Sequence, residues 1–82
     1  MTSADIRQVV LEVLKRIAPE VDAASLAPDV NVREELDLDS MDFLNFVIAL
    51  HETLHVEIPE SDYPKVACLD ACVDHLAALL AA

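Results

Sequence analysis

Three segments of the chain repeat apolar residues at the three- and four-residue spacing of an α-helix, and this spacing restricts the fold more than any other feature. Such residues lie on one side of a helix and pack against a neighbouring helix. The chain has no glycine, and 55% of its 82 residues are hydrophobic, which is typical of helical packing and not of a turn-rich β fold. We therefore expect an all-α fold in one small domain that covers residues 1–82. The stripes of the first and last segments are Ile6, Val9, Val10, Val13, Leu14 and Ile17, and Leu69, Cys72, Val73, Leu76 and Leu80.

Residues at the ends of the first segment set its expected helix boundaries. Thr2 or Ser3 can cap the start of the helix. Lys15 and Arg16 then lie in its last turn, where positive charge is favoured by the helix dipole. The first helix should therefore run from about residue 3 to residue 17.

Prolines mark the connections between the helical segments. Pro19 and Pro28 bracket a stretch with little periodicity up to Asp39, so we expect an irregular connection of roughly twenty residues. Asp62 and Pro64 predict a short third helix of about two turns, with Asp62 as its cap and the proline in its first turn. A last helix should then run nearly to the end of the chain.

The helix expected at residues 40–54 carries two apolar stripes. Asp39 precedes this helix and can cap its first turn. A helix that is apolar on both sides is either buried on both sides or carries a binding surface. In so small a domain, we favour a partner-docking surface over a deeper core for the second stripe. The expected core stripe is Phe43, Phe46, Val47, Leu50 and Leu54, and the second stripe is Met41, Leu44 and Ile48 together with His51 and His55.

The charge of the chain restricts its partners. Sixteen acidic residues against five basic ones give a formal charge of −11, which repels phosphate backbones and attracts basic protein surfaces. We therefore expect no nucleic-acid ligand. The chain starts without a basic stretch followed by a long apolar run, and no apolar stretch reaches membrane-spanning length. We expect no signal peptide, no membrane insertion and a cytoplasmic location.

Two groups of reactive residues suggest metal or redox chemistry, and neither pattern is complete. The segment HETLH, residues 51–55, has the spacing of a zinc-peptidase motif, but a catalytic zinc needs a third ligand. The remaining histidine, His75, is expected beside the core stripe of the last helix, whereas His51 and His55 lie opposite the core face of theirs. Cys68 and Cys72 do not form a C-x-x-C pair. We expect no metal site and two small, reduced core cysteines.

The tetrapeptide Asp39-Ser40-Met41-Asp42 opens the middle helix, where a serine side chain should be exposed and an attached anion is favoured. Plain helix capping would explain this tetrapeptide alone. The longer run VREELDLDSMDFLNFVIALHETLHVEIPESDYPKVACLDACVDHL, residues 32–76, resembles the acyl carrier protein family. It has a Glu-x-Leu-x-x-Asp-Ser-Leu/Met-Asp motif, an amphipathic helix, Ile-Pro, a short acidic helix and a final helix. The resemblance implies a four-helix bundle, with three longer helices, one short third helix and a long loop between the first two.

The resemblance also implies a carrier function. In this family, a phosphopantetheinyl transferase uses coenzyme A and Mg²⁺ to attach a 4′-phosphopantetheine arm to the motif serine, here Ser40. The thiol of the arm carries acyl groups as thioesters. The carrier is not an enzyme, because its hydroxyl is activated only inside the transferase. The implied partners are acyl-activating, ketosynthase or acyltransferase-type enzymes with basic docking surfaces, in fatty-acid, polyketide or related biosynthesis, and the carrier is expected to be a monomer.

Two further sets of residues follow from the resemblance by position. The first would form the docking face read by partner enzymes, and the second would line a pocket that sequesters the acyl cargo. The docking face is Asp39, Met41, Asp42, Leu44, Asn45, Ile48 and Glu52. The acyl pocket is Leu50, Ile58, Val66 and Cys72.

Three departures from the family pattern indicate a specialised carrier with its own partners. Asp37 stands where a glycine is often found, which should stiffen the loop before the serine. Asn45 and His51 stand where many fatty-acid carriers have acids, and Phe43 is bulkier than usual. The Asp-Ser-Met triplet also occurs in D-alanyl carriers, so an aminoacyl cargo of the D-alanyl or peptidyl type is an alternative. An unmodified helical interaction module is the alternative from another class.

Overall fold

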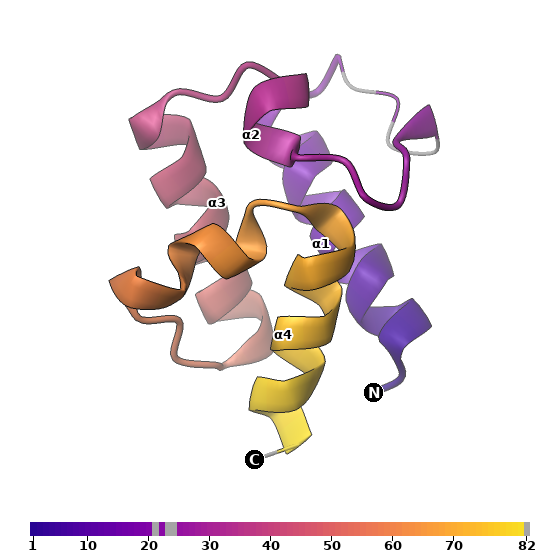
Figure 1. Ribbon diagram of the computed structural model, residues 1–82, viewed down its shortest axis with the longest axis vertical. Helices are drawn as coiled ribbons and strands as arrows, with labels where there is room; N and C mark the ends of the chain where they lie inside the picture. Colours follow the sequence, from indigo (N-terminus) through magenta and orange to yellow (C-terminus); the bar gives the residue numbers. More distant parts are fainter. Residues whose placement is uncertain (21, 23–24, 82) are drawn as a thin grey trace.

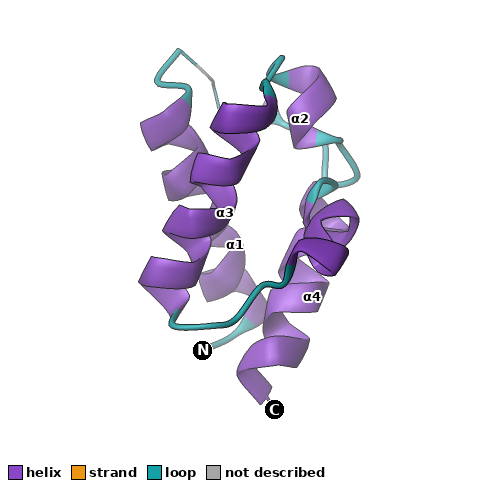
Figure 2. Cartoon of the chain, turned by 90° about the vertical axis from the view of Figure 1, so that its left-hand side faces the viewer, coloured by secondary structure: helices purple, strands orange, loops and turns teal. Residues whose placement is uncertain are grey.

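The structure of the chain, a computed structural model, describes residues 1–20, 22 and 25–81. Its helices are α1 (Ser3–Ile17), α2 (Val32–Glu35), α3 (Ser40–Leu54), the 3-10 helix η2 (Glu60–Val66) and α4 (Leu69–Ala81). Helix α1 packs against both α3 and α4, and η2 packs against α4. Figures 1 and 2 show α2 at one end of the bundle and both chain termini at the opposite end. The predicted all-α bundle is confirmed, with one short helix more than expected.

The first helix begins and ends where its flanking residues predict. The Thr2 hydroxyl accepts a hydrogen bond from the Asp5 amide (3.1 Å), and the Asp5 carboxylate accepts one from the Thr2 amide (3.0 Å). This reciprocal capping box satisfies two amides that the helix itself leaves unpaired. The hydrogen bond from the Thr2 amide, followed by that from its hydroxyl, lowers the pKa of the Asp5 carboxyl group. At the other end, the Ala18 amide donates to the Leu14 carbonyl (2.8 Å).

The hydrophobic core lies between the three long helices and η2. All five residues of the predicted core stripe on α3 are buried, and Phe46 is completely so. Two predictions at the margin of the core are wrong. Leu80 is 37% exposed, because the last turn of α4 extends past the other helices (Figures 1 and 2). Cys68 is only half-buried at the start of α4, whereas Cys72 is buried, and both are free thiols.

From residue 25 onward, the connection between α1 and α3 is more ordered than its sequence suggests, and residues 21, 23 and 24 of the predicted irregular stretch lie outside the described residues. It contains α2, a single turn whose cap is Asn31, with the Asn31 side chain accepting from the Glu34 amide (3.0 Å). Backbone hydrogen bonds also tie the connection to the region before α4. The Val32 amide donates to the Ala67 carbonyl (2.8 Å), and the Leu69 amide donates to the Val30 carbonyl (2.8 Å). One turn is too short to show helical periodicity, so the sequence pattern missed it.

The short third helix is present, but its predicted start is wrong. It begins at Glu60 after Pro59, and it is a 3-10 helix that contains Pro64. Asp62 is not its cap but its third residue, and its carboxylate contacts His75 Nε2 (2.9 Å) and Lys65 Nζ (3.6 Å). The contact with His75 joins η2 to α4, whereas the contact with Lys65 lies within η2. Proline disfavours a continuous α-helix, which agrees with the tighter 3-10 turn.

Candidate functional site

Ser40 is the first residue of α3, and its side chain is exposed. The carboxylate of Asp39 caps the helix by accepting a hydrogen bond from the Asp42 amide (2.8 Å), as the sequence predicts. Leu38, just before the cap, is 7% exposed and anchors the loop in the core. The serine hydroxyl is therefore presented at a defined place, at the end of the bundle where α2 lies (Figure 1).

The loop between α2 and α3 turns at Asp37, which has a left-handed backbone with φ of 52°. The Leu38 amide donates to the Arg33 carbonyl (2.9 Å), and the Asp37 amide donates to the Glu34 carbonyl (3.3 Å). These two hydrogen bonds form a Schellman motif, in which the left-handed position usually holds glycine. The motif gives a physical reason for the glycine often found at this position in the family, and aspartate adopts the same conformation here.

Arg33 contacts Ser40 directly, a contact that the sequence analysis did not single out. Its Nη2 donates a hydrogen bond to the Ser40 hydroxyl oxygen (3.1 Å). Its guanidinium also lies over the ring of Phe43, 5.5 Å from the ring centroid, which is within the range of a cation–π interaction. The only sequence signal for a role of Arg33 was its positive charge within an acidic run. The proximity of Arg33 to Ser40 depends on the turn of α2, which the sequence did not predict.

An open hollow of about 400 Å³ lies beside Ser40. The bulky Phe43 forms part of its wall, together with Tyr63 from η2, and the two rings meet edge to face with centroids 6.1 Å apart. The large ring of Phe43 therefore contacts both η2, through Tyr63, and the guanidinium of Arg33. The hollow is lined by Arg33, Ser40, Phe43, Leu44, Glu60 and Tyr63.

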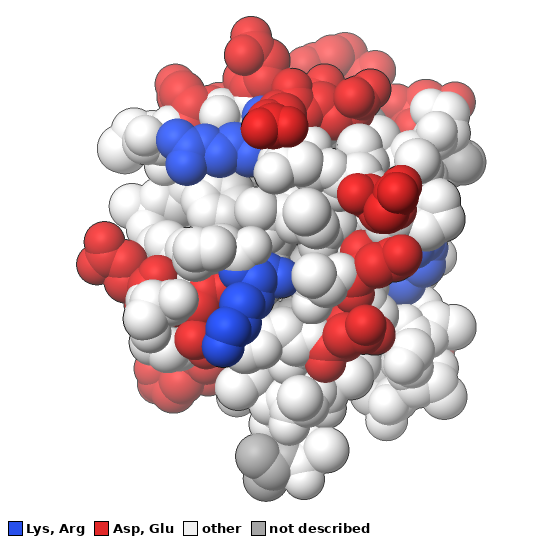
Figure 3. Space-filling view, in the orientation of Figure 1, with Lys and Arg blue, Asp and Glu red and all other residues white. Residues whose placement is uncertain are grey.

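The second stripe of α3 is exposed, which excludes the deeper core as an explanation for it. Met41 is 65%, Leu44 36% and Ile48 43% exposed. The polar residues predicted for the same face are also at the surface, except that Asp42 is half-buried. Acidic side chains also gather at the edge of the molecule above α2 (Figure 3). The surface around Ser40 thus combines apolar side chains with negative charge.

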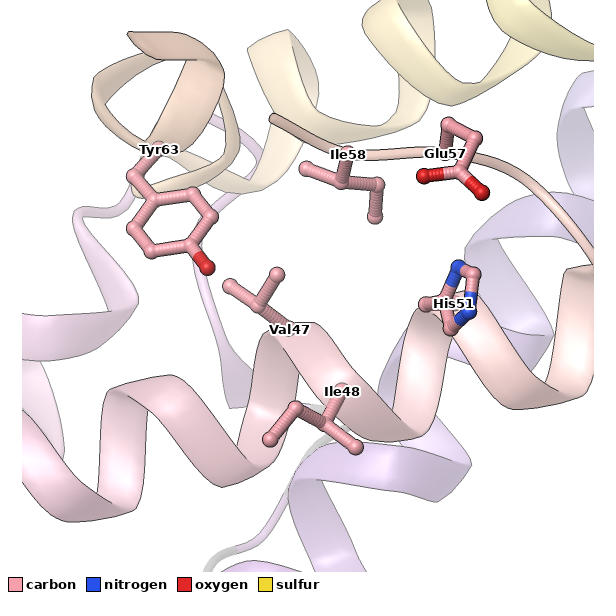
Figure 4. Close-up of a pocket in the computed structure, with 6 residues that line it drawn as sticks. All are labelled: Val47, Ile48, His51, Glu57, Ile58 and Tyr63. Atoms are coloured by element: carbon pink, nitrogen blue, oxygen red, sulfur yellow. The ribbon is translucent and has the colours of Figure 1, made fainter. Parts of the chain in front are cut away.

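The four residues predicted to line an acyl pocket are all buried in the same core cluster. Ile58 also lines a second open hollow, of about 200 Å³, between α3 and the segment that follows it. In Figure 4, Val47 and Ile58 lie on opposite sides of this hollow, His51 and Glu57 lie toward one end of it, and Tyr63 toward the other. Leu50, Val66 and Cys72 belong to the packed interior, where burial raises the pKa of the Cys72 thiol to about 12.

Two of the three histidines make contacts at the end of α3, and the third joins two elements. His51 Nδ1 lies 2.6 Å from the Val56 carbonyl oxygen. His55 ends α3 in a left-handed conformation, with its amide donating to the His51 carbonyl (2.9 Å). His75 Nε2 contacts the Asp62 carboxylate (2.9 Å), between α4 and η2. In the part of the chain that the structure describes, no group of three or more metal-ligating side chains gathers at one place.

Known proteins share both the sequence pattern and the fold. The family model described as "phosphopantetheine attachment site" matches residues 4–76. The acyl carrier protein of Campylobacter jejuni strain 81-176 is 32% identical over 75 residues, which cover 92% of this chain and 91% of that protein. Acyl carrier protein 2, mitochondrial, of Arabidopsis thaliana is also 32% identical, over 77 residues that cover 94% of this chain, and the match spans 60% of that longer protein.

The fold agrees with these matches. The solved structure of the acyl carrier protein from Enterococcus faecalis superposes with a TM-score of 0.82 at 24% identity and covers 96% of this chain and 99% of that one. Among the described residues, no helix is both long and apolar enough to cross a bilayer. The resemblance noted in the sequence is confirmed, and the chain belongs to the family of phosphopantetheine-dependent acyl carrier proteins.

Proposed function

We propose that the chain carries acyl groups as thioesters on a 4′-phosphopantetheine arm attached to Ser40. The observation that carries this proposal is the exposed hydroxyl at the first position of α3, inside the motif that the family model matches. The hydroxyl has room around it, because the hollow beside Ser40 is open. When bound, the arm supplies the thiol to which an acyl group is joined.

The chain's own contribution to the attachment step is to hold the nucleophile in place. The Ser40 oxygen forms a bond to the phosphorus atom of coenzyme A that bears the pantetheine. The bond from that phosphorus to the bridging oxygen of the diphosphate breaks, and adenosine 3′,5′-bisphosphate leaves. The serine proton must pass to a base of the transferase, because the group that contacts Ser40 here is a guanidinium, which cannot accept one. The chain supplies the hydroxyl and the transferase supplies the base, which supports a role as a carrier rather than as an enzyme.

An intact-mass measurement tests the attachment site. The protein is incubated with coenzyme A, Mg²⁺ and a broad-specificity phosphopantetheinyl transferase, alongside Ser40→Ala and Ser3→Ala. Ser3 is a matched control, since it is also an exposed serine at the first position of a long helix. We expect the wild type and Ser3→Ala to gain one phosphopantetheine and Ser40→Ala to gain none. A gain in Ser40→Ala, or no gain in the wild type with several transferases, would contradict the proposal and favour an unmodified interaction module.

We also propose that partner enzymes dock on the exposed stripe of α3 and its acidic rim. The apolar side chains can bury surface against a partner, and the acids can steer basic surfaces toward it. The proposed face comprises Asp39, Met41, Asp42, Leu44, Asn45, Ile48 and Glu52. The transferase and enzymes that load, extend or remove acyl groups are the proposed partners.

Leu44→Ser tests the docking face, and Leu80→Ser is its control. The two leucines are almost equally exposed, at 36% and 37%, but Leu80 lies on α4. We expect Leu44→Ser to raise the KM of the transferase for the carrier several-fold and Leu80→Ser to leave it unchanged. Equal effects of the two variants would show that general surface apolarity, and not this face, determines docking.

The acyl cargo is proposed to enter between α3 and η2, where Ile58 already lines an open hollow. Leu50, Val66 and Cys72 would then make up its deeper lining. An acyl cargo is preferred to an aminoacyl one because the relatives compared above are named acyl carriers. A single domain that works as a monomer in the cytoplasm remains a prediction, which analytical ultracentrifugation and cell fractionation can check.

A further inference from the structure

We infer that Arg33 binds the phosphodiester through which Ser40 would hold its arm, and thereby fixes the base of the arm beside Phe43. This inference rests on the proposed attachment at Ser40. It assigns to one residue of this chain a role that neither the motif nor the docking face contains. Arg33 is a positioning residue in this role, because it contacts the linkage and not the thiol where acyl groups are exchanged.

The distance between the two side chains carries the first step of the inference. Arg33 Nη2 lies 3.1 Å from the Ser40 hydroxyl oxygen. A phosphorus atom bonded to that oxygen places its two non-bridging oxygens one bond further out, within reach of the same guanidinium. Hydrogen bonds between a guanidinium and phosphate oxygens are shorter and stronger than a bond to a neutral hydroxyl, and they are frequently bidentate. The existing contact would therefore become stronger after attachment.

The guanidinium is already held in the required place. It lies over the Phe43 ring at 5.5 Å from the centroid. That ring is itself 6% exposed and packs against Tyr63 and Phe46. At the other end of the residue, the Arg33 carbonyl accepts the hydrogen bond that closes the turn after α2. A side chain ordered before its ligand arrives loses less conformational entropy on binding.

The charge balance around Arg33 points to an anionic ligand. The chain has 16 acidic and 5 basic residues, and carboxylates contact two of the other four cations: Arg7 pairs with Asp70 (3.8 Å) and Lys65 with Asp62 (3.6 Å). Within the described residues, Arg33 forms no ion pair, and its two side-chain contacts are with a neutral hydroxyl and an aromatic ring. A cation without a carboxylate partner thus lies at the one hydroxyl that would receive a phosphodiester.

The test compares two forms of each protein: the apo form, without phosphopantetheine, and the holo form, with phosphopantetheine attached. The proteins are the wild type, Arg33→Gln, Arg33→Lys and the control Arg16→Gln. Arg16 is an exposed arginine in the last turn of α1. Two readouts are measured: the ³¹P chemical shift of the phosphodiester between low and high NaCl, and the increase in Tm on conversion from apo to holo. Neither readout depends on the activity of a partner enzyme.

We expect the ³¹P shift of Arg33→Gln to differ from that of the wild type at low salt, and the two to converge as NaCl screens the pair. The wild type should gain about 3 °C more in Tm on conversion than Arg33→Gln. Arg33→Lys should be intermediate, because lysine keeps the charge and loses the bidentate geometry. Arg16→Gln should match the wild type in both readouts.

Two results would overturn the inference in distinguishable ways. If the wild type gains no phosphopantetheine by mass, the proposed function fails and this inference fails with it. If all proteins gain it but the ³¹P shifts and Tm increments of the wild type and Arg33→Gln agree, the inference alone is wrong. Should Arg33→Gln be a poor transferase substrate, the Arg33 Nε–H resonance of the wild type decides: it must move on conversion and return toward its apo position with salt.

Discussion

Replacing Asp37 with glycine should stabilise the protein, because Asp37 occupies the left-handed position of the turn that leads to Ser40. Its φ is 52°, and its amide and that of Leu38 already make both hydrogen bonds of the Schellman motif. Glycine can keep these bonds without the contact between Cβ and the backbone that disfavours left-handed residues. That contact costs roughly 1–2 kcal/mol, and somewhat less for aspartate. Glycine loses part of the benefit through greater freedom in the unfolded chain, so the net gain should be about 0.5–1 kcal/mol.

The assay is urea unfolding followed by circular dichroism, with thermal melting beside it. For a domain of this size, the gain corresponds to an increase in Tm of about 2–8 °C. Asp37→Asn is the matched control, because it removes the same charge but keeps a side chain that tolerates the left-handed region. Asp37→Ala should be less stable than either. If Asp37→Gly is no more stable than Asp37→Asn, the effect is one of charge, and the argument from backbone conformation is wrong.

Three other perturbations test the core and the first helix. The Cys72 thiol, whose pKa is raised to about 12 by burial, should react with a disulfide reagent at pH 8 far more slowly than the half-buried Cys68, and equal rates would contradict the burial. Phe46→Ala should cost about 3–5 kcal/mol, because Phe46 is completely buried, and a loss below about 1 kcal/mol in urea unfolding would show that the core can collapse around the gap. The pKa of Asp5 is lowered from 3.8 chiefly by the Thr2 amide, so its ionised form favours folding above about pH 4, and this contribution is lost as the pH falls through the lowered value. The difference in Tm between wild type and Asp5→Asn should therefore be present at pH 7 and shrink below pH 3.8, and a constant difference would refute this linkage.

The structure shows what contacts are made by the residues that depart from the family pattern. Phe43 is not simply larger than usual, because it forms the wall of the hollow at Ser40 and the support for Arg33. His51 contributes a hydrogen-bonding contact to the Val56 carbonyl at the end of α3, where an acid could not donate. Asn45 remains an exposed neutral residue in the proposed docking face. Asn45 and His51 distinguish the surface of this carrier from one built with acids along the helix.

Local signals in the sequence were enough for the long helices and for the serine. The starts of α1 and α3 follow from capping residues that act within one turn, and the buried and exposed stripes of α3 follow from spacing alone. These features depend on residues close together in the chain, so a short stretch of sequence is enough to predict them. The motif around Ser40 is local for the same reason, and it identified the family before any fold was known.

Tertiary structure decided the features that depend on distant partners. Helix α2 exists as one turn held by backbone bonds to the region before α4, and without it Arg33 would not reach Ser40. Asp62 lies inside η2 and not at its cap, and it pairs with His75 of α4, a residue distant in the sequence. Leu80 fits a helical stripe by spacing, but it is exposed because the last turn of α4 extends past the other described helices. Periodicity says which side of a helix is apolar, whereas the presence of a packing partner on that side is set only when the whole chain has folded.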